Sequence, residues 1–255
     1  MLLVFDIGNT NITLGVFDGD KLRATWRMAT DVHQTPDEYA ARLLTLLPHR
    51  DIDKSDISEI ALCSVVPPLT STFIELSQHY FHLSPFVVGP GVKTGVRIRM
   101  DNPREVGADR IVDAAAAHHL YGGPVIIVDL GTAITFDTVS KEGDYLGGAI
   151  APGLLIAAEA LYTRTAALPR IQLVPPKRAI GTNTVDAMQS GLIFGFVGLI
   201  EGIVSRIQKE LGQKALVVAT GGYAGLLTGQ TLIIDKVNSD LTLIGLRLIH
   251  QMNKE

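Results

Sequence analysis

The chain has 255 residues, of which 47% are hydrophobic and 19% charged, with a formal net charge of −4 at pH 7. This composition excludes a disordered chain, and the absence of any basic run leaves nucleic-acid binding without an electrostatic basis. The single cysteine, Cys63, excludes a disulfide scaffold and a cysteine-based zinc site. The longest apolar stretch, residues 191–200, falls well short of the ~20 residues of a membrane span, so we expect a cytoplasmic protein that does not cross a membrane.

The first half of the chain alternates between strand and helix signals. An apolar strand ends at Asp6-Ile7-Gly8, and a second extended run follows over residues 12–17 before the turn Asp18-Gly19-Asp20. Thr35 and Glu38 predict a capping box, with Pro36 at the first position of a helix that runs to about Leu47. Further predicted elements are a strand at 59–66, a helix at 69–81, a short strand at 86–88 and a helix at 108–121.

The second half begins with the same pattern as the first. Residues 2–10 read LLVFDIGNT and residues 125–133 read VIIVDLGTA, which places Asp129 at the position of Asp6. A second extended run, 134–139, and turn residues 141–144 follow again, and the later predicted elements are helices at 153–165 and 185–211 and a strand at 215–219. The repeat predicts a duplicated α/β fold of mixed sheets and helices, with domains 1–117 and 118–255 and a cleft between them.

The repeated Asp-x-Gly turn is the main candidate for phosphate binding. A turn with glycine and short polar side chains lets backbone N–H groups approach phosphate oxygens, and Asp6 at its start is able to hold Mg²⁺ through water. A plain β-turn would use the same residues, but its recurrence favours the functional interpretation. The chain lacks the P-loop motif, and we interpret the glycine-rich segment 89–95 as an ordinary turn.

Several motifs together carry a resemblance to a known family. The repeated turn resembles the phosphate motifs of the acetate and sugar kinase, Hsp70 and actin superfamily, whose halves have a ribonuclease-H-like, actin-like ATPase fold. The segment 221–225 resembles the adenosine motif of that superfamily. More narrowly, the chain resembles a type III pantothenate kinase through DIGNTNITLGVF at 6–17, SVVPPL at 64–69, DNPREVGADR at 101–110, DLGTAITFD at 129–137, GGAIAPGL at 147–154 and GTNTVDAMQSG at 181–191.

The resemblance implies a role for each motif. It implies that ATP is bound by Asp6, Ile7, Gly8, Asn9, Thr10, Asn11, Ile12, Thr13 and Thr132. It implies that pantothenate is bound by Gly107, Ala108, Asp109, Arg110 and Thr184, with Asp109 accepting the proton of the attacking hydroxyl. It also implies a monovalent cation, K⁺ or NH₄⁺, on Asp129, Mg²⁺ near Asp6, and a homodimer. One position departs from the family pattern, because Met100 stands where the family commonly has a tyrosine that contacts pantothenate.

Purely structural roles are alternatives to some of these assignments. Asp109 could serve only to complement the dipole of its helix, and Thr184 could serve as a helix cap. We interpret Cys63 as a small buried residue and the seven histidines as structural or surface residues. Gly191, Gly195, Gly198 and Gly202 form a smooth stripe on one predicted helix, for packing within the domain or for a dimer contact.

The predicted function is ATP-dependent phosphorylation of pantothenate to 4′-phosphopantothenate, the first step of coenzyme A biosynthesis. One alternative is an ATP-binding regulatory accessory factor. The other is a kinase of the same fold that acts on a different small hydroxylated substrate.

Overall fold

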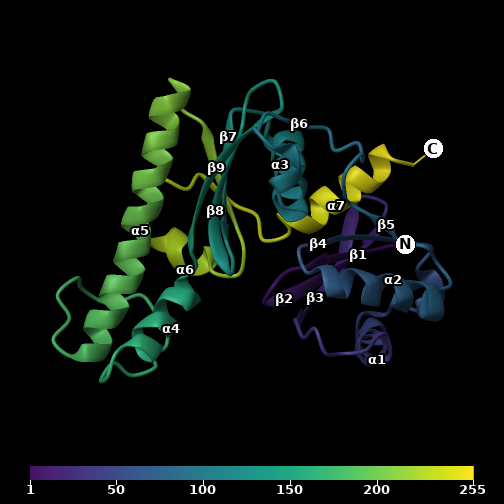
Figure 1. Cartoon of the computed structure of the whole chain (residues 1–255), viewed down its shortest axis with the longest axis horizontal. Helices are drawn as coiled ribbons and strands as arrows, with labels where there is room; N and C mark the ends of the chain where they lie inside the picture. The colour runs from purple at the N-terminus through teal and green to yellow at the C-terminus, as the bar shows by residue number, and fades with distance from the viewer. Residues whose placement is uncertain (255) are drawn as a thin grey trace. The chain divides into compact units, whose positions relative to one another are not determined.

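The computed structural model describes residues 1–254 and divides into two compact units (Figure 1). The first unit comprises residues 1–95, 102–116 and 242–255, and the second comprises residues 96–101 and 117–241. The units therefore differ from the expected uninterrupted domains 1–117 and 118–255, because the C-terminal segment belongs to the first unit and residues 96–101 belong to the second.

The sheet of the first unit has the order β3-β2-β1-β4-β5. Its strands are β1 (Leu2–Ile7), β2 (Asn11–Asp18), β3 (Lys21–Ala29), β4 (Glu59–Ser64) and β5 (Phe86–Val87). Strands β1, β2 and β3 form an antiparallel meander, whereas β4 lies parallel to β1 and β5 lies parallel to β4.

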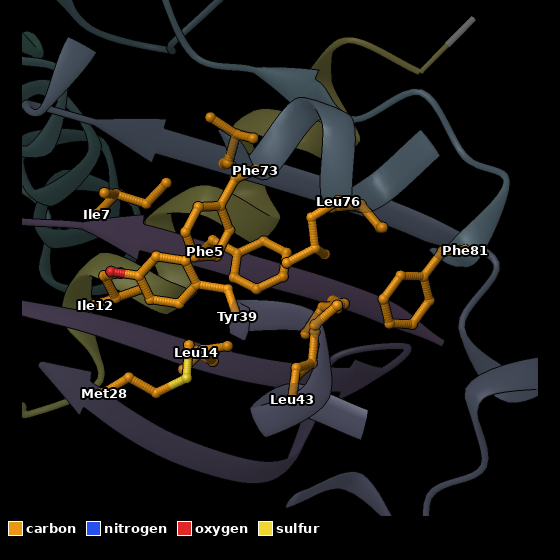
Figure 2. Close-up of a cluster of buried hydrophobic side chains, with 14 of the residues drawn as sticks. Phe5, Ile7, Ile12, Leu14, Met28, Tyr39, Leu43, Phe73, Leu76 and Phe81 are labelled. Atoms are coloured by element: carbon orange, nitrogen blue, oxygen red, sulfur yellow. The ribbon is translucent and has the colours of Figure 1, made fainter. Parts of the chain in front are cut away.

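Helices α1 (Pro36–Leu46) and α2 (Pro67–Phe81) supply the core on one face of this sheet. Figure 2 shows the aromatic centre of that core, where the Phe5 and Phe73 rings lie 4.9 Å apart edge to face and Tyr39 lies 5.0 Å from Phe73. The predicted capping box of α1 is present, since the Thr35 hydroxyl accepts from the Glu38 N–H and the Glu38 carboxylate accepts from the Thr35 N–H.

The sheet of the second unit has the order β11-β10-β7-β8-β9-β6. Its strands are β6 (Arg97–Ile98), β7 (Val125–Leu130), β8 (Ala133–Val139), β9 (Asp144–Pro152), β10 (Leu216–Thr220) and β11 (Lys236–Val237). The helices assigned wholly to this unit are α4 (Leu154–Arg164), α5 (Thr184–Leu211) and the short α6 (Ala224–Leu227).

The two sheets confirm the predicted duplication. In each, a three-stranded antiparallel meander is followed by two parallel strands, so β7, β8, β9, β10 and β11 repeat β1, β2, β3, β4 and β5. The repeat is not perfect at the turn. Ile7 pairs with Ile12 across the first hairpin, whereas Leu130 pairs with Ile134 across the second, so the second turn is one residue shorter.

The C-terminal helix α7 (Leu241–Met252) joins the first unit by packing against α3 (Ala108–Tyr121). A Cβ at Gly245 would lie 2.2 Å from the Val112 carbonyl oxygen, so the two helix backbones approach closely at this glycine. Leu243 of the same helix lies over Val4 and Gly15 on the sheet face opposite the aromatic core. This helix therefore fixes the position of α3, on which Asp109 lies.

Most predicted elements are present within a few residues of their expected bounds, but several others were missed. No element was predicted for the segments that form β3, β6, β9, α6, β11 and α7. Segment 89–95 has no helix or strand, which agrees with its interpretation as a turn.

Helix α5 agrees with the predicted helix at 185–211 and extends well beyond the apolar stretch 191–200. Its 28 residues are long and apolar enough to cross a membrane by length and composition, although one such helix is weak evidence and a core helix passes the same test. Leu192, Ile193, Phe196, Ile200 and Val204 of this helix belong to the buried core of the second unit.

Candidate active site

The turn after β1 is tied down by the end of β3. Inside the turn, the Gly8 N–H donates to the Asn11 carbonyl oxygen at 3.0 Å. From outside, the Thr30 hydroxyl donates to the Gly8 carbonyl oxygen at 2.6 Å, and the Thr30 N–H donates to the Thr10 carbonyl oxygen at 3.0 Å. Because the turn carbonyls are held in this way, the exposed turn residues Asn9 and Thr10 present a fixed backbone to a ligand.

Gly8 is constrained by space and not by its backbone dihedral. It is absent from the glycines with a positive φ, so its backbone conformation is one that other residues also adopt. A Cβ there would lie 3.1 Å from the Asn11 carbonyl oxygen, which is tighter than ordinary contact. The glycine thus keeps the turn narrow.

Two carboxylates lie near one another beside this turn. Burial, and next the negative charge of Asp109, raise the pKa of Asp6 from 3.8 to about 7. The Cys63 thiol donates to Asp6 Oδ1 at 3.4 Å and, like the charge of Arg27, lowers that pKa in part. A site that holds two carboxylates against their repulsion favours a cation or a proton between them.

Cys63 is buried, as expected, but it also touches the site. Burial raises the pKa of its thiol well above the ordinary value, and the charges of Asp6 and Asp109 raise it further, so the group stays a neutral S–H donor. The pairing register predicts this contact, because Cys63 lies directly opposite Asp6 on the neighbouring strand β4. The linear sequence alone, in which the two residues are 57 positions apart, gave no sign of it.

Gly107 leaves room for the Asp109 carboxylate. A Cβ at position 107 would lie 2.5 Å from Asp109 Oδ1, closer than real Cβ atoms approach. The same carboxylate oxygen accepts from the Arg110 N–H at 2.8 Å, at the start of α3. The segment Gly107–Arg110 therefore holds the Asp109 side chain in one position, through a backbone donor on one side and a glycine on the other.

In the second unit, Gly221 leaves room for the Asp129 carboxylate. A Cβ at Gly221 would lie 2.3 Å from Asp129 Oδ1, and one at Gly131 would lie 3.4 Å from Asp129 Oδ2. Gly221 has a φ of 90°, which favours glycine, and the Tyr223 N–H donates to the Leu130 carbonyl oxygen at 3.1 Å. The segment 221–225, which resembles the adenosine motif, thus packs directly on the end of β7.

The remaining predicted residues of the second unit lie on its surface. Thr132 is exposed in the turn between β7 and β8, and Thr184 is exposed at the first residue of α5. The cap of α5 is not Thr184 but Asn183, whose side chain accepts from the Asp186 N–H at 2.9 Å. Met100 packs over β9, because its sulfur would lie 2.7 Å from a Cβ at Gly147.

The donor chemistry fits cations bound with a ligand better than a closed metal cage. Within residues 1–254, no group of three or more His, Cys, Asp or Glu side chains is arranged to hold a metal ion. Magnesium in phosphate sites commonly uses one or two carboxylates, with waters and phosphate oxygens completing its octahedron. Asp6 and its neighbour Asp109 offer carboxylates of that kind in the first unit.

Comparison with known proteins agrees with the duplicated fold. The structure is similar to a conserved candidate transcriptional activator of the Baf family from Campylobacter jejuni, with a TM-score of 0.60, 20% identity and 98% of each chain covered. It is also similar to an inorganic polyphosphate/ATP-glucomannokinase from an Arthrobacter species, with a TM-score of 0.50, 15% identity and 99% of each chain covered. At these identities the likeness shows the fold, which is that of the actin-like ATPases and sugar kinases.

The sequence comparisons are more specific. A type III pantothenate kinase from Dehalococcoides mccartyi is 57% identical over 253 residues, covering 99% of this chain and 96% of that protein. Residues 2–206, which include both Asp-x-Gly turns and the Gly107–Arg110 segment, match the type III pantothenate kinase family. Because this match extends over most of its length, the chain belongs to the type III pantothenate kinase family.

Proposed function

We propose that the protein transfers the terminal phosphoryl group of ATP to the primary hydroxyl of pantothenate in the cytoplasm, as the first step of coenzyme A biosynthesis. The observation that carries this proposal is the pair of neighbouring carboxylates, Asp6 and Asp109, beside a tethered glycine turn in a chain of this family. One carboxylate serves the bound nucleotide and the other serves the acceptor hydroxyl.

Asp109 is assigned as the proton acceptor. As the hydroxyl oxygen of pantothenate forms its bond to the terminal phosphorus, the bond from that phosphorus to ADP breaks, and the hydroxyl proton passes to the Asp109 carboxylate. Phosphoryl transfer has a loose transition state, so positioning matters more than the strength of the base. The Arg110 N–H and Gly107 supply that positioning.

The turn residues Asp6–Thr13 are assigned to the phosphates of ATP, and Thr132 is assigned to the same ligand. Gly107, Ala108, Arg110 and Thr184 are assigned to pantothenate. Asp6 would hold Mg²⁺ through water, and the ion would supply positive charge that offsets the charge of the phosphates. The exposure of Asn9, Thr10 and Thr184 supports these assignments, because none of them is covered within its own unit.

We assign a monovalent cation, K⁺ or NH₄⁺, to Asp129. The close approach of Gly221 supports this assignment, because a residue without a side chain leaves room beside the carboxylate for a cation and its other ligands. The test is an assay in sodium or Tris salts with saturating Mg²⁺, followed by K⁺ at constant ionic strength. Activation that disappears in Asp129→Ala is expected, and equal rates in Na⁺ and K⁺ would exclude the assignment.

A homodimer through the second unit is the proposed assembly. One expectation was that the glycine stripe on α5 packs within the domain. A Cβ at Gly191, Gly195 or Gly198 would meet nothing within 4 Å, so these glycines face open space. Exposed apolar side chains on the same unit include Ile150, Ile156, Ile180 and Val185. Light scattering of the wild type and of Gly195→Glu is expected to give a dimer and a monomer, respectively.

The decisive test of the function is an ADP-release assay with pantothenate, and with sugars and acetate as alternative acceptors. Mass spectrometry of the product is expected to show one added phosphoryl group on pantothenate. Asp109→Asn keeps the size of the side chain but loses proton acceptance, and the rate is expected to fall by ~10²–10⁴. Binding of ATP without any phosphorylated pantothenate would instead favour the accessory-factor alternative.

A further inference from the structure

Four side chains of the first sheet lie in one row across four strands. Asp6 on β1 pairs with Cys63 on β4 and with Thr13 on β2, and Thr13 in turn pairs with Arg27 on β3. Residues directly opposite one another in neighbouring strands point to the same face of a sheet. The order on this face is therefore Cys63, Asp6, Thr13 and Arg27, and the aromatic core lies on the other face.

Arg27 is the cation of this row. The sequence from Asp6 to Thr13 contains no lysine, arginine or histidine, so the turn itself brings no positive side chain to a phosphate. The strand spacing of ~4.8 Å places the Arg27 backbone ~10 Å from that of Asp6, and the long arginine side chain covers part of this distance. Its charge reaches the site, because it lowers the pKa of the Asp6 carboxyl.

The guanidinium of Arg27 is available to a ligand. It is exposed, and within residues 1–254 it makes no hydrogen bond or ion pair. Arg23, on the same strand, differs in this respect because it donates to Asp18 at 3.2 Å. A free guanidinium in line with a phosphate turn and a partly buried carboxylate has the planar donor set that matches phosphate oxygens.

We propose that Arg27 binds the terminal phosphate of ATP, next to Thr13 and on the side away from Cys63. This role deepens the proposed kinase function and rests on it for the identity of the nucleotide. The guanidinium would neutralise charge on the terminal phosphate as that group leaves ADP, which is the part of the reaction where an arginine contributes most. No sequence motif pointed to Arg27, since only the strand register brings it into line with Asp6.

The test compares binding of ATP and ADP to the full chain, measured by calorimetry with Mg²⁺. In Arg27→Met, affinity for ATP or a non-hydrolysable analogue is expected to fall at least ~10-fold, while affinity for ADP changes less than threefold. Arg27→Lys is expected to recover part of the loss, since it keeps the charge but not the fork. The control Arg23→Met removes an exposed arginine of the same strand and is expected to bind both nucleotides as the wild type does.

Kinetics give a second measurement. The value of kcat/KM for ATP is expected to fall by ~10²–10³ in Arg27→Met, with an unchanged melting temperature. A variant with the wild-type ratio of ATP to ADP affinity would overturn the assignment, whatever the kinetics. If the wild type fails to phosphorylate pantothenate but Arg27→Met still loses ATP selectively, the kinase proposal fails and the Arg27 assignment stands. A wild type that binds no ATP overturns both.

Discussion

At the scale of single residues, Gly107 determines where the Asp109 carboxylate lies. Gly107→Ala would bring a Cβ to 2.5 Å from Asp109 Oδ1, and the short aspartate side chain relieves this contact only by leaving its position. We expect kcat to fall by ~10–100-fold with a melting temperature within a few degrees of the wild type, because a displaced catalytic group costs rate and not stability. Steady-state kinetics and thermal melts measure the two effects.

The matched control is Gly89→Ala, since a Cβ at Gly89 would meet nothing within 4 Å. This variant is expected to keep wild-type kinetics. A fully active Gly107→Ala would show that the Asp109 carboxylate tolerates displacement, and the assignment of Asp109 as the proton acceptor would lose its structural support.

The raised pKa of Asp6 predicts a dependence of stability on pH. Between its unfolded value near 3.8 and the folded value of about 7, the folded protein holds a proton that the unfolded chain has released. Stability of the metal-free and nucleotide-free protein from this group is therefore greatest at low pH and is lost as the pH rises through 7. Asp6→Asn, which stays neutral, is expected to exceed the wild type only slightly near pH 5 and to melt several degrees higher at pH 8.

This comparison is made in EDTA, by thermal melts of both proteins from pH 5 to pH 9. The variant is also expected to lose activity, because the neutral amide no longer supports Mg²⁺. If the melting temperatures of the two proteins differed by the same amount at every pH, folding would not raise the pKa of the Asp6 carboxyl. Comparison of the two proteins cancels the other titrating groups.

At the scale of elements, the end of β3 positions the phosphate turn. Thr30→Val keeps the shape of the side chain but removes the hydroxyl that donates to the Gly8 carbonyl oxygen at 2.6 Å. Because this bond holds the turn in place, its loss is expected to weaken ATP binding by ~2–10-fold. Calorimetry measures this change.

Thr25→Val is the control for Thr30→Val, because Thr25 is an exposed threonine of the same strand that pairs with Gly15, away from the turn. The control is expected to bind ATP normally. Equal affinities of Thr30→Val and the wild type would show that the backbone bonds, Gly8 N–H to Asn11 and residue 30 N–H to Thr10, are enough to hold the turn.

Local signals predicted the elements that are bounded by clear capping or turn residues. The Thr35–Glu38 capping box and the repeated Asp-x-Gly turn could be read directly, because each depends on residues a few positions apart. Strand β3 was missed although Ala24 and Met28 face the core in alternation with exposed residues, and α7 was missed because Gly245 interrupts its apolar pattern. The reason for a glycine at position 245 is its contact with Val112, which lies 133 positions earlier in the chain.

The same limit applies to the site. Residues within one motif, such as Gly107 and Asp109, could be named from sequence. The contacts of Asp6 with Cys63 and Arg27 depend on strand register across separate segments, which no local pattern encodes. The sequence repeat directed attention to the pair Asp6 and Asp129, whereas the carboxylate that raises the pKa of Asp6 is Asp109.

At the scale of the whole molecule, the chain returns to its first unit at the end. Residues 242–255 belong to that unit, and α7 covers the sheet face that carries Val4 and Gly15. A fragment that stops at residue 241 would expose this face and the buried side of α3. We expect this fragment to aggregate or to melt without a cooperative transition, because the first unit has lost part of its apolar core.

A circular permutant separates the need for α7 from the need for its connection. Met1 and Lys254 line one pocket of about 180 Å³, and Lys254 pairs with Glu59 at 2.6 Å, so a short Gly/Ser linker spans from the C-terminal end to Met1. We expect a chain ordered 242–255, linker, 1–241 to unfold cooperatively and to bind ATP, since permutation is tolerated where termini are close. A truncated protein as stable as the wild type, or a permutant that fails to fold, would contradict the packing of α7 as the closing element of the first unit. The fragment and the permutant together test this directly, since both contain residues 1–241 and only the permutant also supplies α7.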